Sequence, residues 1–184
     1  MTTSTITPAE RSGQSNMPQG TERAHTLVIL VEDRPGSVDR VIGLLRRRRA
    51  NMQTLVLGRS EQPEVARVTV VVNDSEVALE HLVEQLRKVV DVQQVMNLLS
   101  QQMVARELAL IKVKCTPENW HEIVERSHFF GAHAIDVAPE AVTFEVTGSE
   151  EKIGKLIELL QTYGIREIAR SGRVAMAWGV GEEA

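Results

Sequence analysis

The sequence contains little that could support a disulfide, a membrane span or an aromatic core. It has one cysteine, Cys115, among 184 residues, and aromatic residues make up 3% of the chain. Since a lone cysteine cannot form a disulfide within its own chain, the fold needs no oxidising compartment, and a cytoplasmic location is expected. No stretch approaches the roughly 20 apolar residues of a membrane-spanning helix. The hydrophobic core must therefore be aliphatic.

Positive charge is also in short supply. The chain has 21 Lys and Arg against 25 Asp and Glu, a net charge of −4, whereas nucleic-acid-binding domains usually carry a basic surface. Residues 46–49 form a run of four arginines that could contact a phosphate backbone. A solvent-exposed helix end is the better interpretation of this run, because cations complement the negative end of the helix dipole. The composition thus disfavours a nucleic-acid partner.

Motifs of enzyme active sites and metal centres are missing as well. The sequence has no Gly-rich phosphate loop, no GxSxG motif and no CxxC or HxxxH spacing. His121 and His128 are seven residues apart in a predicted helix, about 10 Å along its axis, which is too far for one ion without a third ligand between them. Surface histidines and a core cysteine are favoured over a metal site. A small ferredoxin-like enzyme is disfavoured because no nucleophile and base are paired.

The first half of the chain has the pattern of a split ferredoxin-like unit. An apolar strand at residues 25–32 ends in an Asp-Arg-Pro-Gly turn, and apolar residues at i, i+3, i+4 and i+7 then predict a helix over residues 36–48. Two β-rich segments, a second amphipathic helix and a last strand follow, at residues 51–59, 65–72, 73–90 and 92–98. The order βαββαβ predicts a four-stranded antiparallel sheet with both helices on one face. The first and third strands are the most continuously hydrophobic and should be central, with the other two at the edges.

The second half repeats this order. Strands are predicted at residues 108–113, 132–139, 141–148 and 165–170, with a helix after Thr116 and another capped by Ser149. The fold class is therefore α+β, with two ferredoxin-like units at residues 25–99 and 106–180. Residues 100–105 are expected to form a polar connector. Residues 1–24 are rich in Thr, Ser, Gln, Gly and Pro and are expected to form a disordered tail.

Particular residues in both halves resemble one known family. Residues 31–72 resemble the ACT domain of the regulatory small subunits of acetohydroxyacid synthase, also called acetolactate synthase. The positions that match are Gly36, Arg40, Val41, Gly43, Leu44, Asn51 and Leu55. Residues 106–113, 134–139 and 167–172 are similar to the C-terminal domain of that family. Three positions depart from its usual pattern: Asp33 stands where many members have Asn, Arg49-Ala50 replaces Gly-aromatic, and Met52 replaces Ile.

The resemblance implies a non-catalytic regulatory subunit that forms a homodimer through its ACT domain. Its partner would be a catalytic large subunit that uses thiamine diphosphate, FAD and Mg to condense 2-oxo acids, with no cofactor held by this chain. Valine, leucine or isoleucine would bind the small subunit as a feedback inhibitor. The alternative is a stand-alone tandem-ACT amino-acid sensor or transcriptional regulator. The C-terminal segments of the resemblance argue against that alternative.

The effector site is expected at the turn after the first strand. Its residues would be Asp33, Pro35, Gly36, Ser37 and Val38, together with Asn51 from a neighbouring ACT domain. Gly36 lacks a Cβ and would let the ligand approach the backbone, where the free N–H groups of the helix can hold an α-carboxylate. Asp33 could receive the ammonium group, and Val38 could shelter a branched side chain. Two other interpretations are open: Gly36 can serve only to reach positive φ, and Asn51 only to turn the chain.

Overall fold

The computed structural model describes residues 23–99 and 102–179, and the predicted disordered tail lies almost wholly outside them. The N-terminal unit has the predicted order of elements: β1 (Arg23–Glu32), α1 (Ser37–Arg47), β2 (Met52–Arg59), β3 (Val65–Asp74), α2 (Glu76–Leu86) and β4 (Val92–Leu98). Its strands form an antiparallel sheet in the order β2-β3-β1-β4. The prediction that the first and third strands are central is confirmed.

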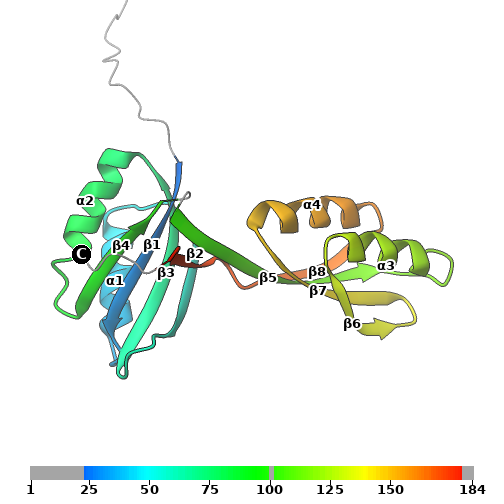
Figure 1. Cartoon of the computed structure of the whole chain (residues 1–184), viewed down its shortest axis with the longest axis horizontal. Helices are drawn as coiled ribbons and strands as arrows, with labels where there is room; N and C mark the ends of the chain where they lie inside the picture. Colours follow the sequence, from blue (N-terminus) through cyan, green and yellow to red (C-terminus); the bar gives the residue numbers. More distant parts are fainter. Residues whose placement is uncertain (1–22, 100–101, 180–184) are drawn as a thin grey trace, which may run out of the picture.

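Both helices of this unit cover one face of the sheet (Figure 1). Alternate residues of β1, among them Leu27, Ile29 and Val31, pack with Val41 and Leu45 of α1 in a single hydrophobic cluster. All five of these side chains are fully buried. The period of two in the strand and of 3.6 in the helix, which is visible in the sequence, therefore determines which face each element buries.

The C-terminal unit repeats the arrangement. Its elements are β5 (Met103–Lys114), α3 (Trp120–Phe129), β6 (His133–Ala138), β7 (Ala141–Gly148), α4 (Glu150–Gln161), β8 (Ile165–Arg170) and β9 (Val174–Ala177). The main path of the sheet is β6-β7-β5-β8, and Ile111, Phe144 and Ile153 are fully buried in its core. Cys115 packs in the same core, as expected, and burial raises the pKa of its thiol. The α+β class with two βαββαβ units is confirmed.

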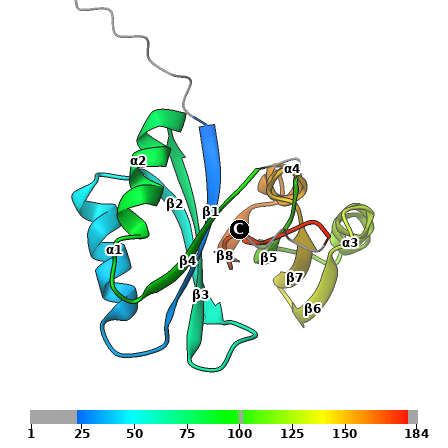
Figure 2. The same cartoon turned by 60° about the vertical axis from the view of Figure 1, so that its left-hand side comes forward.

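The connector between the units differs from the prediction. Instead of a polar loop through residue 105, β5 begins at Met103, and its first four residues pair antiparallel with β9. The β5/β9 ribbon lies against the N-terminal sheet on the side without helices (Figure 2), where Arg67 of β3 donates a hydrogen bond to the carbonyl oxygen of Ala175 at 2.8 Å. Val28 and Val71, which alternate with the helix-facing residues, are buried on this side.

A membrane-spanning helix is not found in the two described stretches: no helix there combines the necessary length and apolar character.

Candidate functional site

The turn between β1 and α1, where the sequence predicts the effector site, places a glycine directly before a helix. Gly36 is the N-cap of α1 and has φ 87°, a left-handed conformation that glycine adopts without steric cost. No side chain from the described residues caps this helix. The N–H of Ser37, the first residue of α1, donates to the carbonyl oxygen of Arg34 at 3.2 Å, whereas the N–H groups of Val38 and Asp39 have no backbone partner among the described residues and remain available at the turn. Both interpretations of Gly36 from the sequence are thus compatible with the structure.

The other predicted residues of the turn differ in accessibility. Asp33 and Pro35 are exposed, whereas Val38 is partly buried. The backbone N–H of Asp33 donates to the carbonyl oxygen of Glu64 at 2.8 Å, which ties the turn to the start of β3. Ser37 is fully buried, and its Oγ has no hydrogen-bond partner among the described residues.

A cluster of charged side chains connects this turn to its neighbours. Asp91, the residue before β4, has a fully buried carboxylate that accepts hydrogen bonds from Arg34 in the turn and from Nε of Arg40 in α1. Arg34 also pairs with Glu32 at 2.9 Å. The hydrogen bond from Arg40 lowers the pKa of Asp91 most, and the one from Arg34 lowers it further. The bond to Asp91 in turn raises the pKa of Arg34. The turn is therefore anchored to the start of β4.

Sequence reasoning missed Asp91. It lies between a helix and a strand, where an aspartate is typical of an ordinary turn. A signal was nevertheless present in the two arginines. Arg34 and Arg40 flank the N-terminus of α1, and a cation is unfavourable at that positive end of the helix dipole unless a carboxylate lies close to it.

Asn51 lies at the opposite end of the same sheet. Its carbonyl oxygen accepts a hydrogen bond from Asn73 near the end of β3, whereas Glu32, just before the turn, pairs with Val65 at the start of β3. At about 3.3 Å per residue, the eight steps from Val65 to Asn73 separate the two places by roughly 26 Å. One chain therefore does not bring Asn51 to Gly36. The expected contribution of Asn51 from a neighbouring ACT domain stays a prediction.

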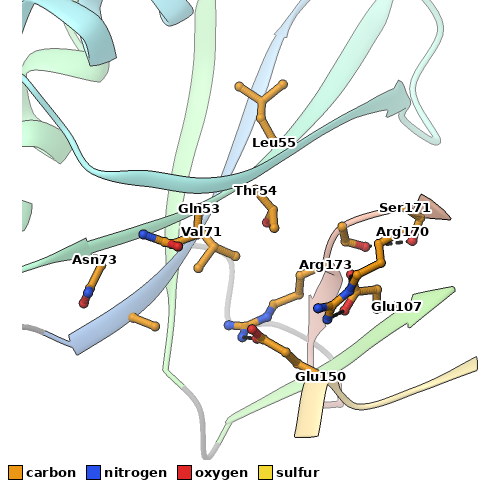
Figure 3. Close-up of a pocket in the computed structure, with 12 residues that line it drawn as sticks. Gln53, Thr54, Leu55, Val71, Asn73, Glu107, Glu150, Arg170, Ser171 and Arg173 are labelled. Carbon is orange, nitrogen blue, oxygen red and sulfur yellow. Dashed lines mark hydrogen bonds and ion pairs between the residues drawn. The ribbon is translucent and has the colours of Figure 1, made fainter. Parts of the chain in front are cut away.

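A cavity of about 630 Å³ lies between the two units (Figure 3). On its C-terminal side, Arg170 donates two hydrogen bonds to Glu107, at 2.8 and 2.6 Å. Arg173 donates to Oγ1 of Thr26 in β1 at 2.9 Å and pairs with Glu150 of α4. Because each arginine already has a carboxylate partner, this cavity presents paired charges, and Arg173 connects the two units.

The histidines and their acidic neighbours are the groups that a metal ion would use. Within the described part of the chain, no group of three or more His, Cys, Asp or Glu side chains lies close enough together to hold a metal ion. His121 and His128, the pair considered from the sequence, both lie in α3. The ring of His128 instead meets that of His133 edge-on, with centroids 6.5 Å apart.

Comparisons with known proteins match both units. The family model described as "AHAS small subunit-like ACT domain" matches residues 27–94, and the model described as "Small subunit of acetolactate synthase" matches residues 106–179. The chain is 41% identical over 155 residues to the probable acetolactate synthase small subunit of Archaeoglobus fulgidus. The aligned region covers 84% of this chain and 97% of the Archaeoglobus fulgidus protein. It is 42% identical over 163 residues to the acetolactate synthase small subunit of Mycolicibacterium smegmatis, covering 89% of this chain and 95% of that one.

The fold is also similar to a solved structure. The crystal structure of the acetolactate synthase small subunit from Thermotoga maritima superposes with a TM-score of 0.79 and 35% sequence identity. The match covers 86% of this chain and 99% of that one. The similarity therefore extends over both ferredoxin-like units.

Proposed function

The chain belongs to the family of acetolactate synthase small subunits, and on that basis we propose that it is the regulatory subunit of acetolactate synthase in branched-chain amino acid biosynthesis. It would activate the catalytic large subunit and make it sensitive to feedback inhibition by valine, leucine or isoleucine. The observation that supports this most is the match of both units in one chain, at residues 27–94 and 106–179. A stand-alone ACT sensor would need only the first of these matches.

In this proposal the chemistry takes place on the large subunit. That subunit would hold thiamine diphosphate, FAD and Mg and would condense the 2-oxo acids, while this chain contributes no catalytic group. The small subunit acts through binding alone: it binds the large subunit and the effector, and the effector changes the activity of the complex.

The proposed effector site requires two copies of the chain. β2 ends at Arg59, which lies near the start of β3, at the end of the sheet where α1 begins. Asn51 lies at the other end of β2. If two β2 edges pair antiparallel about a twofold axis, the start of each β2 lies beside the end of its partner. Gly36 of one chain and Asn51 of its partner are then brought to the same region, twice per dimer.

Two exposed leucines favour this edge for the dimer. Leu55 and Leu57 of β2 pair with Val70 and Val68 and so lie on the helix-bearing face, yet they are 37% and 53% exposed. Apolar side chains on an edge strand with unpaired backbone groups are typical of a strand that joins another sheet. Pairing through β4 would leave both copies of Asn51 on the outer edges, away from either turn.

Activation can be tested by adding the purified chain to a purified catalytic large subunit of acetolactate synthase and measuring acetolactate formation from pyruvate. The proposal expects the two proteins to co-purify and the rate to rise with the amount of this chain until the complex is saturated. The matched control is the fragment of residues 102–184, which lacks the ACT domain. If the full chain neither binds the large subunit nor changes its rate, the proposed function is wrong.

A further inference from the structure

We propose that Arg40 receives the α-carboxylate of the effector and that Asp91 is the positioning residue that holds Arg40 in place. This inference rests on the proposed effector site at the start of α1 and adds to it a residue outside the predicted turn. The recognised group is the α-carboxylate that the proposed site already places at the start of α1.

The geometry at Gly36 supports this role. Arg40 lies one helical turn after Gly36, and its backbone N–H donates to the Gly36 carbonyl oxygen at 3.1 Å. A Cβ placed on Gly36 would lie 3.5 Å from Nη1 of Arg40. The guanidinium group therefore borders the space that the missing side chain of Gly36 leaves open. A carboxylate that approaches the backbone at Gly36 would meet this group.

The hydrogen bonds of Arg40 leave donors for a ligand. Its Nε donates to Asp91, but its two terminal nitrogens have no hydrogen-bond partner among the described residues, and its side chain is 47% exposed. A guanidinium group can bind a carboxylate through two parallel N–H donors. Because Asp91 takes only Nε, it fixes the direction of the side chain without occupying the terminal nitrogens.

The positive end of α1 adds to the attraction for an anion. Arg40 is a cation in the first turn of a helix, where the dipole disfavours positive charge. A bound carboxylate would interact favourably with the dipole, with the free N–H groups and with Arg40 together. At the same turn, the fully buried Ser37 Oγ has no hydrogen-bond partner among the described residues and so keeps its capacity to bond a polar group.

Arg34 provides a matched comparison on the other side of Asp91. It donates to the same carboxylate but also pairs with Glu32, so two carboxylates neutralise it locally. Among the described residues, leaving aside the chain neighbours of Gly36, Arg40 alone comes within 4 Å of a Cβ placed on Gly36, and Arg34 does not. Loss of Arg34 should therefore weaken the attachment of the turn to Asp91 but leave Arg40, which binds the effector carboxylate, in place.

The test uses calorimetry of the full chain with valine, leucine and isoleucine and with the corresponding carboxamides, in which the carboxylate is neutral. For each variant the quantity of interest is the ratio of the amide Kd to the amino-acid Kd. Loss of one charged hydrogen bond corresponds to about a ten- to 150-fold change in affinity. We expect Arg40→Gln to lower the ratio by at least about tenfold, Arg40→Lys and Asp91→Asn to lower it less, and Arg34→Gln to retain most of it.

A purely structural role for Arg40 would weaken the acid and its amide equally, so an unchanged ratio in Arg40→Gln overturns the inference and leaves the effector site standing. An equal fall in the ratio in Arg34→Gln also overturns it, because the effect would then belong to the anchor of the turn. If Arg40→Gln does not fold, the test rests on Arg40→Lys and Asp91→Asn. A ratio equal to that of the wild type in both of these variants would overturn the inference. If the wild-type chain binds none of the three amino acids, the proposed effector site itself is wrong.

Discussion

Substitution of Gly36 by aspartate should separate feedback inhibition from activation. In the folded chain, the new residue must adopt φ near 87°, which costs about 1–2 kcal/mol for a residue with a Cβ. Its Cβ would make ordinary contact with Arg40 Nη1 at 3.5 Å, so no steric clash adds to this cost. A partly exposed pair between the new carboxylate and Arg40 would return less than about 1 kcal/mol. The net loss of about 1 kcal/mol lowers the Tm of a domain of this size by roughly 4–8 °C.

The effect on effector binding should be much larger. The aspartate carboxylate would occupy the place of the effector carboxylate and pair with Arg40 in its stead. Two like charges about 4 Å apart in a partly exposed protein site repel by up to about 4 kcal/mol. We therefore expect the effector concentration for half inhibition to rise by more than about a hundredfold, with activation of the large subunit retained.

The assay is acetolactate formation by the reconstituted complex across a titration of valine, leucine and isoleucine. Gly36→Asn is the matched control, since asparagine has the same shape and a similar backbone strain but no charge. It should raise the half-inhibiting concentration by about tenfold at most, or about 1.4 kcal/mol, which is within the usual cost of added atoms in a packed site. Full inhibition of Gly36→Asp at the wild-type concentration, or equal losses in the two variants, would refute the reasoning from charge.

Asn51→Ala should raise the half-inhibiting effector concentration by about tenfold while activation of the large subunit persists, because one neutral or charged hydrogen bond is lost. Leu57→Asp should convert the dimer to a monomer in sedimentation experiments and abolish effector binding, whereas Val137→Asp, on the equally exposed edge strand β6, should leave the dimer intact. Since the pKa of Asp91 is lowered in the fold, the stability advantage of the wild type over Asp91→Asn should be present above about pH 4 and disappear as the pH falls below it, as measured by urea unfolding. Removal of residues 1–22, which ends where β1 begins, should leave activation and inhibition unchanged in the reconstituted complex.

The sequence predicted most of the fold because its signals are local. Apolar residues at helical spacing gave α1 as Ser37–Arg47 within one residue at each end, and β4 was predicted with its observed bounds, Val92–Leu98. The central position of β1 and β3 followed from their continuous hydrophobicity, since both faces of a central strand are covered in this fold. Here one face meets the helices, and the β5/β9 ribbon lies on the other side.

The missing parts depend on contacts between distant segments. The start of β5 was assigned to a connector because its partner, β9, lies beyond the whole second unit, and neither segment has a strong strand pattern of its own. The ion cluster was missed for a similar reason, since Asp91 meets Arg34 and Arg40 only when β4 folds beside β1. The predicted turn from Asp33 to Val38 is continuous in sequence, whereas Asn51 can join it only from a second chain.

The most direct test of the regulatory role is the response of the large subunit to valine, leucine and isoleucine with and without this chain. Acetolactate formation would be measured across the same range of effector concentrations in both cases. The account predicts inhibition by at least one of the three amino acids in the complex and none in the isolated large subunit. Equal inhibition of the isolated large subunit, or a complex that none of the three inhibits, would contradict it.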